Sequence, residues 1–339
     1  MTKKGNVRIV SIRYELLSRV APSVLCTVLW VFAAFPQSLH AQEACPGPPV
    51  APTAVQMTRW IQMAPDQGFL REIEKDDRKS WLFGTVHLAK MQWLAPGPKT
   101  IAALRAADTI AVEVDLTDPG LGEQLSKSFT ESKKKDASLA IPIELHQRLE
   151  RLAVANCIGK DALAALPWSL KIVTTLLSTA RRDGLEANYS IDGFLAGFAH
   201  ATGKHVVSLE SMGEQLGLIE QLFSAQREGV LQELLDTIES GKALEQLILL
   251  TEAWRNSDWP KISSYLQWCE CARNAEELEQ QRQLNDARNP GLADGIDALH
   301  MAGRKVFAGI GSLHLTGRAP VQELLRAKGY RVTLIRNEP

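Results

Sequence analysis

Trp81-Leu-Phe-Gly84-Thr-Val-His87-Leu88 is matched, near the other end of this 339-residue chain, by Val306-Phe-Ala-Gly-Ile-Gly311-Ser-Leu-His314-Leu315. Each stretch is a β-rich run that breaks at Gly-x-x-His. A proline-containing loop, an amphipathic stretch and a second apolar strand follow each histidine, at 101–107 and 109–114 in the first copy and at 321–327 and 330–335 in the second. The sequence therefore predicts an α/β fold in which a duplicated strand-loop-helix-strand unit builds the central sheet.

Polar residues stand at the ends of four predicted strands: His87, the segment Glu113-Val-Asp115, Glu210 and His314. Ligands bind in the crevice outside the carboxyl ends of the strands of an open α/β sheet, so we expect the two histidines to converge there. A buried carboxylate is costly unless it is paired or bound to a metal. A local hydrogen bond in a loop explains each residue taken alone. Together they favour a divalent-metal site whose open coordination position would activate water.

The other histidines and the common hydrolase motifs give weaker signals. His146, His200, His205 and His300 stand in helical or strand-start contexts, where surface histidines and hydrogen-bonded core histidines are more common than ligands. Neither a Gly-x-Ser-x-Gly elbow nor a phosphate-binding loop occurs in the sequence. The serine-hydrolase and nucleotide-hydrolase classes therefore lack their motif.

A long helical region separates the strands. A first hairpin is expected at 71–74 and 79–85, a buried strand at 109–115 and a further strand at 205–209. Between about 118 and 286 apolar residues recur at helical spacing, as at Leu145, Leu149 and Leu152. We expect this region to form a helical lobe over the crevice and to set the choice of substrate.

The first 41 residues are typical of a secretory signal. Basic residues precede an apolar run at 20–35, and the small residue Ala41 ends the segment. We expect residues 1–41 to be removed, 42–55 to form a flexible leader and 56–339 to form the folded domain, in the periplasm or outside a bacterial cell. The alternative is an uncleaved membrane anchor, for which the apolar run is short.

The charge balance argues against nucleic-acid binding. The whole chain carries 38 Lys+Arg and 39 Asp+Glu, and residues 1–41 hold five of the basic and one of the acidic residues, so the mature chain has a net charge of about −5. A solvated helix or loop face explains the one lysine cluster, 133–135. We expect no nucleic-acid partner and, after signal cleavage, no stable membrane association.

Four cysteines remain after the signal, Cys45, Cys157, Cys269 and Cys271, which is an even number as in proteins of oxidising compartments. A bond between Cys269 and Cys271 is disfavoured because it spans one residue. A zinc site at these two residues lacks a second thiolate pair. We expect a disulfide from Cys157 to Cys269 or Cys271, which would close a loop of about 110 residues and contribute roughly 4 to 5 kcal/mol.

Several motifs in one order resemble the TraB/GumN family, which includes the Tiki proteins. They are Gly84-Thr-Val-His87, Leu94-Ala-Pro96, Ala106-Ala-Asp108-Thr-Ile-Ala-Val-Glu113-Val-Asp115, Asp192 with the Ala-rich helix after it, Gly203-Lys-His-Val-Val-Ser-Leu-Glu210, Arg288-Asn289, and Gly309-Ile-Gly311-Ser-Leu-His314-Leu-Thr-Gly317 with Gly329-Tyr-Arg-Val332. The resemblance spans roughly residues 56–336. One departure is Arg318-Ala-Pro320, where relatives have a glycine-rich turn, and it leaves the shape of that loop open.

The resemblance implies a two-lobed α/β fold related to the erythromycin-esterase and haem-binding ChaN-like proteins. Tiki proteins are membrane-tethered, manganese- or cobalt-dependent proteases, so it also implies a divalent ion, with zinc as a further candidate, and a peptide or protein substrate. The residues carried over as the active site are His87, Glu113, Glu210 and His314, with Arg288 and Asn289 as substrate or transition-state contacts. GumN relatives are encoded with exopolysaccharide machinery and TraB relatives act in pheromone shutdown, so the family does not fix a substrate.

We interpret the chain as an exported metal-dependent hydrolase, in the first place a peptidase. In this hypothesis His87, Glu210 and His314 hold the metal, Glu113 takes a proton from water, and Arg288 faces the developing oxyanion. The alternative is a non-catalytic protein that binds haem, metal or peptide in the same crevice. A degenerate scaffold is disfavoured because both histidines and both glutamates are present.

Overall fold

A computed structural model describes residues 45–136, 141–223 and 228–335. The expected signal, 1–41, and the start of the expected leader lie outside these ranges. In the rest of the expected leader, 45–55, residues 45–53 contain neither helix nor strand, and helix α1 (Ala54–Met63) begins two residues before the expected boundary. Over the described ranges, no helix has the length and apolar character that crossing a membrane requires.

A six-stranded mixed sheet forms the centre of the molecule, with the order β4-β3-β5-β2-β1-β6. Its strands are β1 (Phe69–Lys75), β2 (Arg78–Thr85), β3 (Thr109–Val112), β4 (His205–Ser208), β5 (Val306–Gly311) and β6 (Arg331–Leu334). Each lies where the sequence predicts a strand, and the α/β class is confirmed. All four residues of β3 are buried, as expected for a strand inside a parallel part of a sheet.

The chain leaves the two central strands, β2 and β5, in opposite directions across the sheet. These strands are parallel neighbours. From β2 the chain passes through α2 (Pro98–Ala106) to β3, on the far side of β5, whereas from β5 it passes through α15 (Val321–Ala327) to β6, beyond β2 and β1. The carboxyl ends of β2 and β5 are therefore a topological switch point, where open α/β sheets bind ligands.

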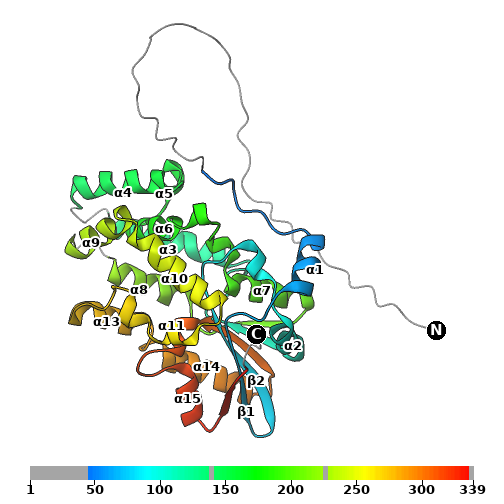
Figure 1. Ribbon diagram of the computed structural model, residues 1–339. Coiled ribbons are helices and arrows are strands. Elements are labelled where there is room, and N and C mark those ends of the chain that lie inside the picture. Colours follow the sequence, from blue (N-terminus) through cyan, green and yellow to red (C-terminus); the bar gives the residue numbers. More distant parts are fainter. Residues whose placement is uncertain (1–44, 137–140, 224–227, 336–339) are drawn as a thin grey trace.

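The hairpin between β1 and β2 projects at the end of the molecule opposite most of the helices (Figure 1). Its two turn residues, Asp76 and Asp77, have φ values of 52° and 55°. Two positive φ angles in succession match the twist of a two-residue hairpin, and Asp tolerates them better than most residues. The turn thus fixes the register in which Lys75 pairs with Arg78.

Helices surround the sheet and fill the middle of the chain (Figure 1). Those between β3 and β5 are α3 (Leu121–Asp136), α4 (Ile143–Ala155), α5 (Lys160–Ala165), α6 (Trp168–Ser178), α7 (Ile191–Thr202), α8 (Met212–Leu222), α9 (Glu228–Glu239), α10 (Lys242–Arg255), α11 (Trp259–Ser263), α12 (Tyr265–Trp268), α13 (Ala275–Leu284) and α14 (Asn289–Met301). Helices α4, α6, α9 and α10 bury a second apolar cluster around Leu149, Ile172 and Leu235. Helix α7 instead packs on β3, and β4 belongs to the sheet, so this part of the chain is not purely helical.

The expected disulfide pairing is wrong, although disulfides are present. The structure joins Cys45 to Cys157 and Cys269 to Cys271. Residues before α1 lie against the helical region, where Val50 N–H donates to the Tyr189 hydroxyl at 3.1 Å, and this brings Cys45 to Cys157. In the second bond, Glu270 between the two cysteines has a left-handed conformation, with φ of 51°.

Candidate functional site

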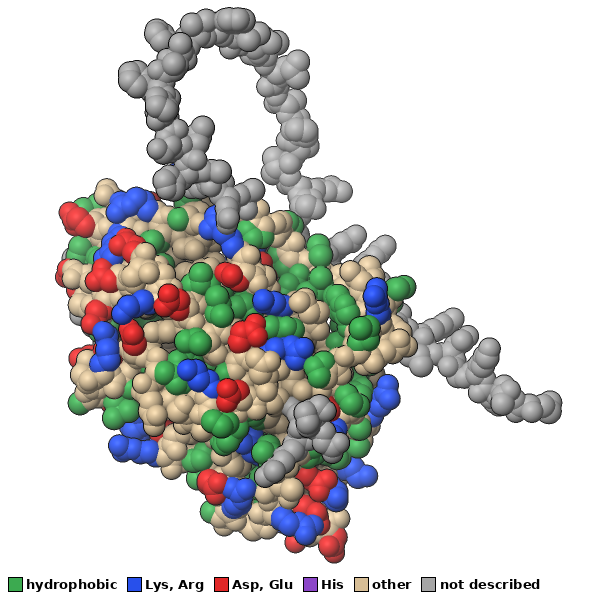
Figure 2. Space-filling view, in the orientation of Figure 1, with side chains coloured by type: hydrophobic (Ala, Val, Ile, Leu, Met, Phe, Trp, Pro, Cys, Tyr) green, Lys and Arg blue, Asp and Glu red, His purple; other side chains and the backbone are tan. Residues whose placement is uncertain are grey.

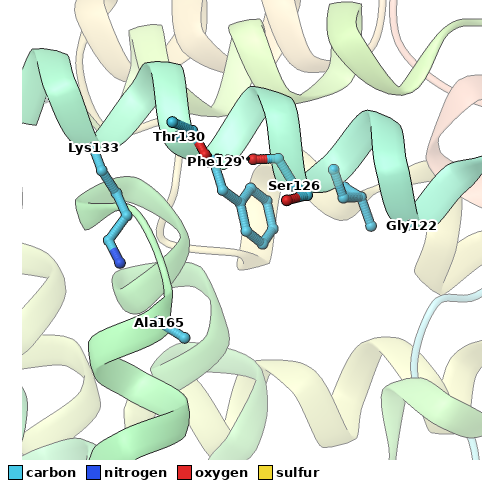
Figure 3. A pocket seen from close by; sticks show the side chains of 7 residues that line it. Gly122, Ser126, Phe129, Thr130, Lys133 and Ala165 are labelled. Atoms are coloured by element: carbon cyan, nitrogen blue, oxygen red, sulfur yellow. Dashed lines mark hydrogen bonds between the residues drawn. The ribbon is translucent and has the colours of Figure 1, made fainter. Parts of the chain in front are cut away.

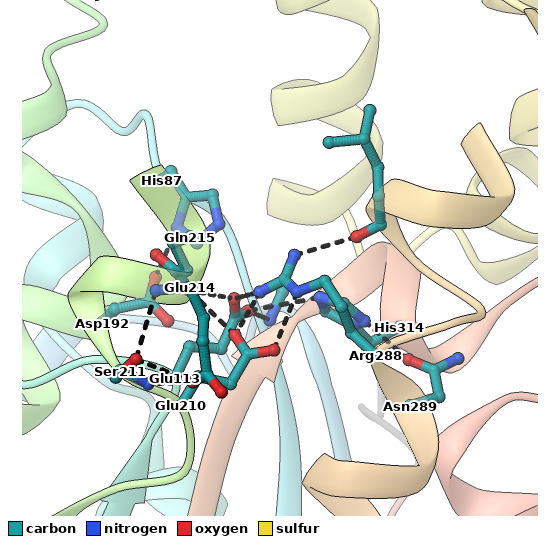
Figure 4. A network of polar contacts seen from close by, with 12 residues as sticks. His87, Glu113, Asp192, Glu210, Ser211, Glu214, Gln215, Arg288, Asn289 and His314 are labelled. Atoms are coloured by element: carbon teal, nitrogen blue, oxygen red, sulfur yellow. Dashed lines mark hydrogen bonds and ion pairs between the residues drawn. The ribbon is translucent and has the colours of Figure 1, made fainter. Parts of the chain in front are cut away.

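The carboxyl ends of the four parallel strands bring together the four residues that the sequence singles out. His87 follows β2, Glu113 follows β3, Glu210 follows β4, and His314 follows β5. Backbone pairing of β3 with β4 continues to the two glutamates, because Glu210 N–H donates to the Glu113 carbonyl at 2.9 Å. Figure 4 shows the resulting cluster of side chains.

His87 is held by a carboxylate from the first turn of α7. Its Nδ1 lies 3.0 Å from Asp192 Oδ2, and the other oxygen of Asp192 accepts a hydrogen bond from the Thr85 hydroxyl at 2.8 Å. Burial lowers the pKa of His87, but the charge and hydrogen bond of Asp192 raise it to about 9. Because 62% of the His87 side chain is exposed, the penalty of burial is weaker than in a core, and the contact with Asp192 decides the direction.

His314 is held by a neutral amide in a buried turn. It lies in the 3₁₀ turn η4 (Ser312–Leu315), and its side chain is 3% exposed. Its Nδ1 lies 2.6 Å from Asn289 Oδ1, while Asn289 Nδ2 donates to the Ala319 carbonyl at 2.9 Å. The amide is thereby oriented with its oxygen toward His314, so Nδ1 carries the proton and Nε2 keeps its lone pair.

Glu113 is the buried acceptor at the centre of the cluster. Its Oε1 accepts the backbone N–H of Gly311 at 2.6 Å and lies 3.6 Å from His314 Nε2. Its Oε2 accepts from Arg288 Nη2 at 2.6 Å and from Gln215 Nε2 at 3.2 Å. Both oxygens of this buried carboxylate are therefore satisfied, as the cost of burying a charge requires.

Gly311 leaves the space in which the histidines approach Glu113. A Cβ at this position would lie 3.1 Å from Glu113 Oε1 and 3.6 Å from both His87 Nε2 and His314 Cδ2. His87 Nε2 and His314 Cδ2 are therefore no further apart than twice 3.6 Å. Glycine at this position allows both imidazole rings and one carboxylate oxygen to lie within 3.6 Å of the same point.

The charges within the cluster depend on one another. Burial raises the pKa of Glu113, but the two histidines oppose this effect, together with Arg288 and the Gly311 N–H, and the net pKa lies below its usual value. Burial lowers the pKa of His314, which is therefore neutral at pH 7. The positive charge that stabilises the Glu113 carboxylate near neutral pH then comes from His87 and Arg288.

Arg288 lies in the middle of the cluster, between the His87 side and the His314 side (Figure 4). Its Nε donates to Glu210 Oε1 at 2.8 Å, and its Nη2 contacts both Glu113 and Glu210. Its Nη1 donates to the Leu284 carbonyl at 2.9 Å. Burial lowers the pKa of Arg288, but the two carboxylates raise it above its usual value, so the guanidinium stays charged.

The donor chemistry of this cluster suits a divalent ion, although the ligands are not preassembled. No group of three or more His, Cys, Asp or Glu side chains in the described parts of the chain is already arranged to hold a metal. Each histidine, however, gives its Nδ1 to a fixed oxygen, which is the outer-shell arrangement of metal-ligating histidines and leaves Nε2 for the ion. The residues present therefore fit such an ion chemically.

Sequence reasoning missed the supporting residues Thr85 and Gln215 and gave Asp192 no role at the site. Asp192 stands in the first turn of a helix capped by Ser190, a pattern that marks the helix start but not a histidine partner. Gln215 follows the capping box of Ser211 with Glu214, which fixes the start of α8 without indicating that Gln215 reaches two carboxylates.

A hollow in the described surface lies elsewhere, between α3 and α5 (Figure 3). Its volume is about 390 Å³, and Phe129, Lys133 and Ala165 help to line it. None of its lining residues belongs to the cluster at the strand ends. Within that cluster, Arg288 fills the space between the two glutamates.

Comparison with known proteins gives one match, which covers most of the chain. The sequence profile of the TraB/PrgY/gumN family matches residues 69–334, a range that contains all six strands and every residue of the cluster. No curated protein and no solved structure matches the chain significantly.

Proposed function

Because the chain belongs to the TraB/PrgY/gumN family, we propose that it is a metal-dependent hydrolase, in the first place a peptidase, whose ion is held by His87, His314 and Glu113. The observation that carries the proposal is the pairing of each histidine Nδ1 with a fixed oxygen, which leaves Nε2 of each ring as the atom that can bind an ion. Because the pKa of His87 is raised to about 9, an ion bound near neutral pH must displace the proton from its Nε2. Manganese or cobalt is the expected ion, with zinc as a further candidate.

The contacts support an exchange of the roles that the sequence suggested for the two glutamates. Glu113 Oε1 is the carboxylate oxygen beside His314, whereas both oxygens of Glu210 are engaged by Arg288, and one also by Gln215. In the proposed assignment, Glu113 is the ligand and Glu210 is the proton acceptor.

The ion, when bound, supplies Lewis-acid chemistry and activates water. Asp192 and Asn289 fix the two imidazole rings, and the buried Asn289 acts through His314, because its own polar atoms are both engaged within the chain. Arg288 remains charged and can face negative charge that develops on a substrate oxygen. Gln215 donates to Glu210 and so orients it for proton transfer.

The matched variants Glu113→Gln and Glu210→Gln test this assignment, with hydrolysis of a peptide library and bound manganese measured for each. Glu113→Gln is expected to lose both ion and turnover. Glu210→Gln is expected to keep the ion and to lose about 10² to 10⁴-fold in rate. Retention of the ion in Glu113→Gln with its loss in Glu210→Gln would restore the original roles. Ion binding by the wild type without cleavage of any peptide would favour a binding protein for haem, metal or peptide.

Export and the wider fold relationship belong to the same proposal. Residues 1–41 have the composition of a secretory signal, which supports a periplasmic or secreted protein that acts on peptides or proteins. A relationship to the erythromycin-esterase and ChaN-like group rests on the family match alone. N-terminal sequencing of protein from the periplasm or medium tests the export: cleavage near Ala41 is expected, and an intact Met1 would contradict it.

A further inference from the structure

The two disulfides close loops of very different length. The bond from Cys45 to Cys157 spans 112 positions, whereas the bond from Cys269 to Cys271 spans two. A disulfide stabilises a fold more when it closes a longer loop, because it removes more freedom from the unfolded chain. Stabilisation of the fold therefore explains the first bond but not the second.

The backbone between the second pair also favours opening. Glu270 has a φ of 51°, a left-handed conformation that is unfavourable for a residue with a Cβ. The side chain of Glu270 forms an ion pair with Lys242 at 2.8 Å, and both side chains are more than half exposed, so this contact holds the loop weakly. Opening the ring lets Glu270 relax.

The two sulfurs differ in a way that suits thiol exchange. Cys269 is 1% exposed, whereas Cys271 is partly exposed. The backbone N–H of Cys271 lies 3.2 Å from Cys269 Sγ and donates to it. Such a donor stabilises a thiolate, so Cys269 is suited to leave when Cys271 is attacked.

We propose that the Cys269–Cys271 disulfide is a redox-active site that exchanges with a dithiol donor, while the Cys45–Cys157 disulfide is structural. A donor thiolate bonds to Cys271 Sγ, the bond to Cys269 breaks, and Cys269 keeps the electron pair and takes up a proton. The second donor thiol then attacks the mixed disulfide, and Cys271 leaves and is protonated. The donor becomes a disulfide as it gives two electrons and two protons to the pair.

Opening this ring removes a local backbone constraint shortly before helix α13, which ends beside the candidate site. Helix α13, which follows Cys271, contains no buried residue. Ion pairs such as Arg273 with Glu277 hold its surface. Its last residue, Leu284, accepts the hydrogen bond of Arg288 Nη1. Reduction therefore loosens α13 and its contact with Arg288. The effect of this loosening on activity rests on the proposed hydrolase function, whereas the redox step itself is independent of it.

Thiol trapping on the full chain tests the redox step. Ion-free protein is equilibrated with mixtures of reduced and oxidised dithiothreitol and alkylated, and the four cysteines are mapped by mass spectrometry. Cys269 and Cys271 are expected to become half reduced at a ratio of reduced to oxidised reagent at least about tenfold lower than Cys45 and Cys157, which is about 30 mV for a two-electron couple. Reduction of both pairs together, or of the longer-loop pair first, would overturn the proposal.

Hydrogen exchange tests the structural consequence without reference to activity. The variant Cys269→Ser/Cys271→Ser is expected to exchange faster than wild type over 275–288, as is the selectively reduced wild type, with β2 and β5 unchanged. Cys45→Ser/Cys157→Ser is the matched control and is expected to leave 275–288 unchanged. Equal protection of 275–288 in the oxidised and reduced wild type would contradict the loosening of α13. None of these measurements requires a bound ion or activity. The hydrolase proposal would fail in the ion-binding and peptide-hydrolysis assays instead, so the two failures are distinguishable.

Discussion

The two Gly-x-x-His motifs end in histidines with opposite surroundings. His87 is 62% exposed and donates to the charged Asp192, whereas His314 is 3% exposed and is held by the neutral Asn289. The pKa of His87 is consequently raised to about 9, and that of His314 is lowered by burial. A repeated motif thus delivers two rings to one place, and partners from other elements decide the charge on each ring.

The largest difference between the two histidines is expected when each ring is removed in turn. His314→Ala leaves a cavity and an unpaired buried amide oxygen on Asn289, so we expect the free energy of unfolding of the ion-free chain to fall by about 2–4 kcal/mol. His87→Ala removes an exposed ring, so water can reach the Asp192 oxygen that loses its partner, and this variant should cost less than half as much. Urea unfolding of the two variants measures the difference, and equal losses would break the comparison.

Exchange of the partner types should exchange the titration behaviour. Asp192→Asn removes the charge beside His87 and is expected to bring the pKa of that ring from about 9 toward its ordinary value. Asn289→Asp gives His314 a carboxylate and should raise its pKa. Removing an outer-shell partner of a ligand typically costs 10 to 100-fold in ion affinity, which is the loss expected for Asp192→Asn. Histidine NMR titrations check both pKa shifts, and unchanged values would show that Asp192 and Asn289 do not set the charges.

The pH dependence of stability should have opposite sign for the two rings. The stability that His87 contributes is fully present below its unfolded pKa of about 6.5 and is lost as the pH rises through about 9. The lowered pKa of His314 has the reverse consequence, because stability is present above about 6.5 and is lost as the pH falls below it. Melting temperatures of wild type, His87→Gln and His314→Gln from pH 5 to 9.5 test these signs. The His87 effect is expected to be small because solvent reaches the ring.

The smallest effect is expected at Gln215, whose side chain donates to the two glutamates. Its Nε2 donates to Glu113 and Glu210, both of which also contact the charged Arg288. Gln215→Ala should therefore lower ion affinity and any turnover only a few-fold, since a neutral hydrogen bond contributes about 1 kcal/mol. Isothermal titration with manganese measures this change, and a loss as large as that of Asp192→Asn would place Gln215 among the groups that fix a ligand.

The strands and the positions of the four strand-end residues could be predicted from the sequence, because both depend on local patterns. Apolar runs bounded by turns locate all six strands, and Gly-x-x-His marks where β2 and β5 end. The order of the strands depends on long-range pairing, so the opposite crossovers from β2 and β5 were not predictable from a repeated unit.

The partners of the site residues and the disulfide pairing could not be predicted for a related reason. Asp192 contacts His87 across 105 positions of sequence and Gln215 contacts Glu113 across 102, and the local patterns of Asp192 and Gln215 indicate only helix starts. The pairing of Cys45 depends on the path of the segment before α1. The pairing of Cys269 involves a left-handed conformation at position 270, which the sequence does not indicate because the residue there is Glu and not Gly.

The central claim is that the two unlike histidines and Glu113 share one divalent ion. Electron paramagnetic resonance of manganese added to the purified chain measures free and bound ion directly. We expect one equivalent to bind to the wild type and to Glu210→Gln, and affinity to fall by at least about 100-fold in His87→Gln, His314→Gln and Glu113→Gln. Absence of binding by the folded wild type, or undiminished binding by both histidine variants, would contradict the account.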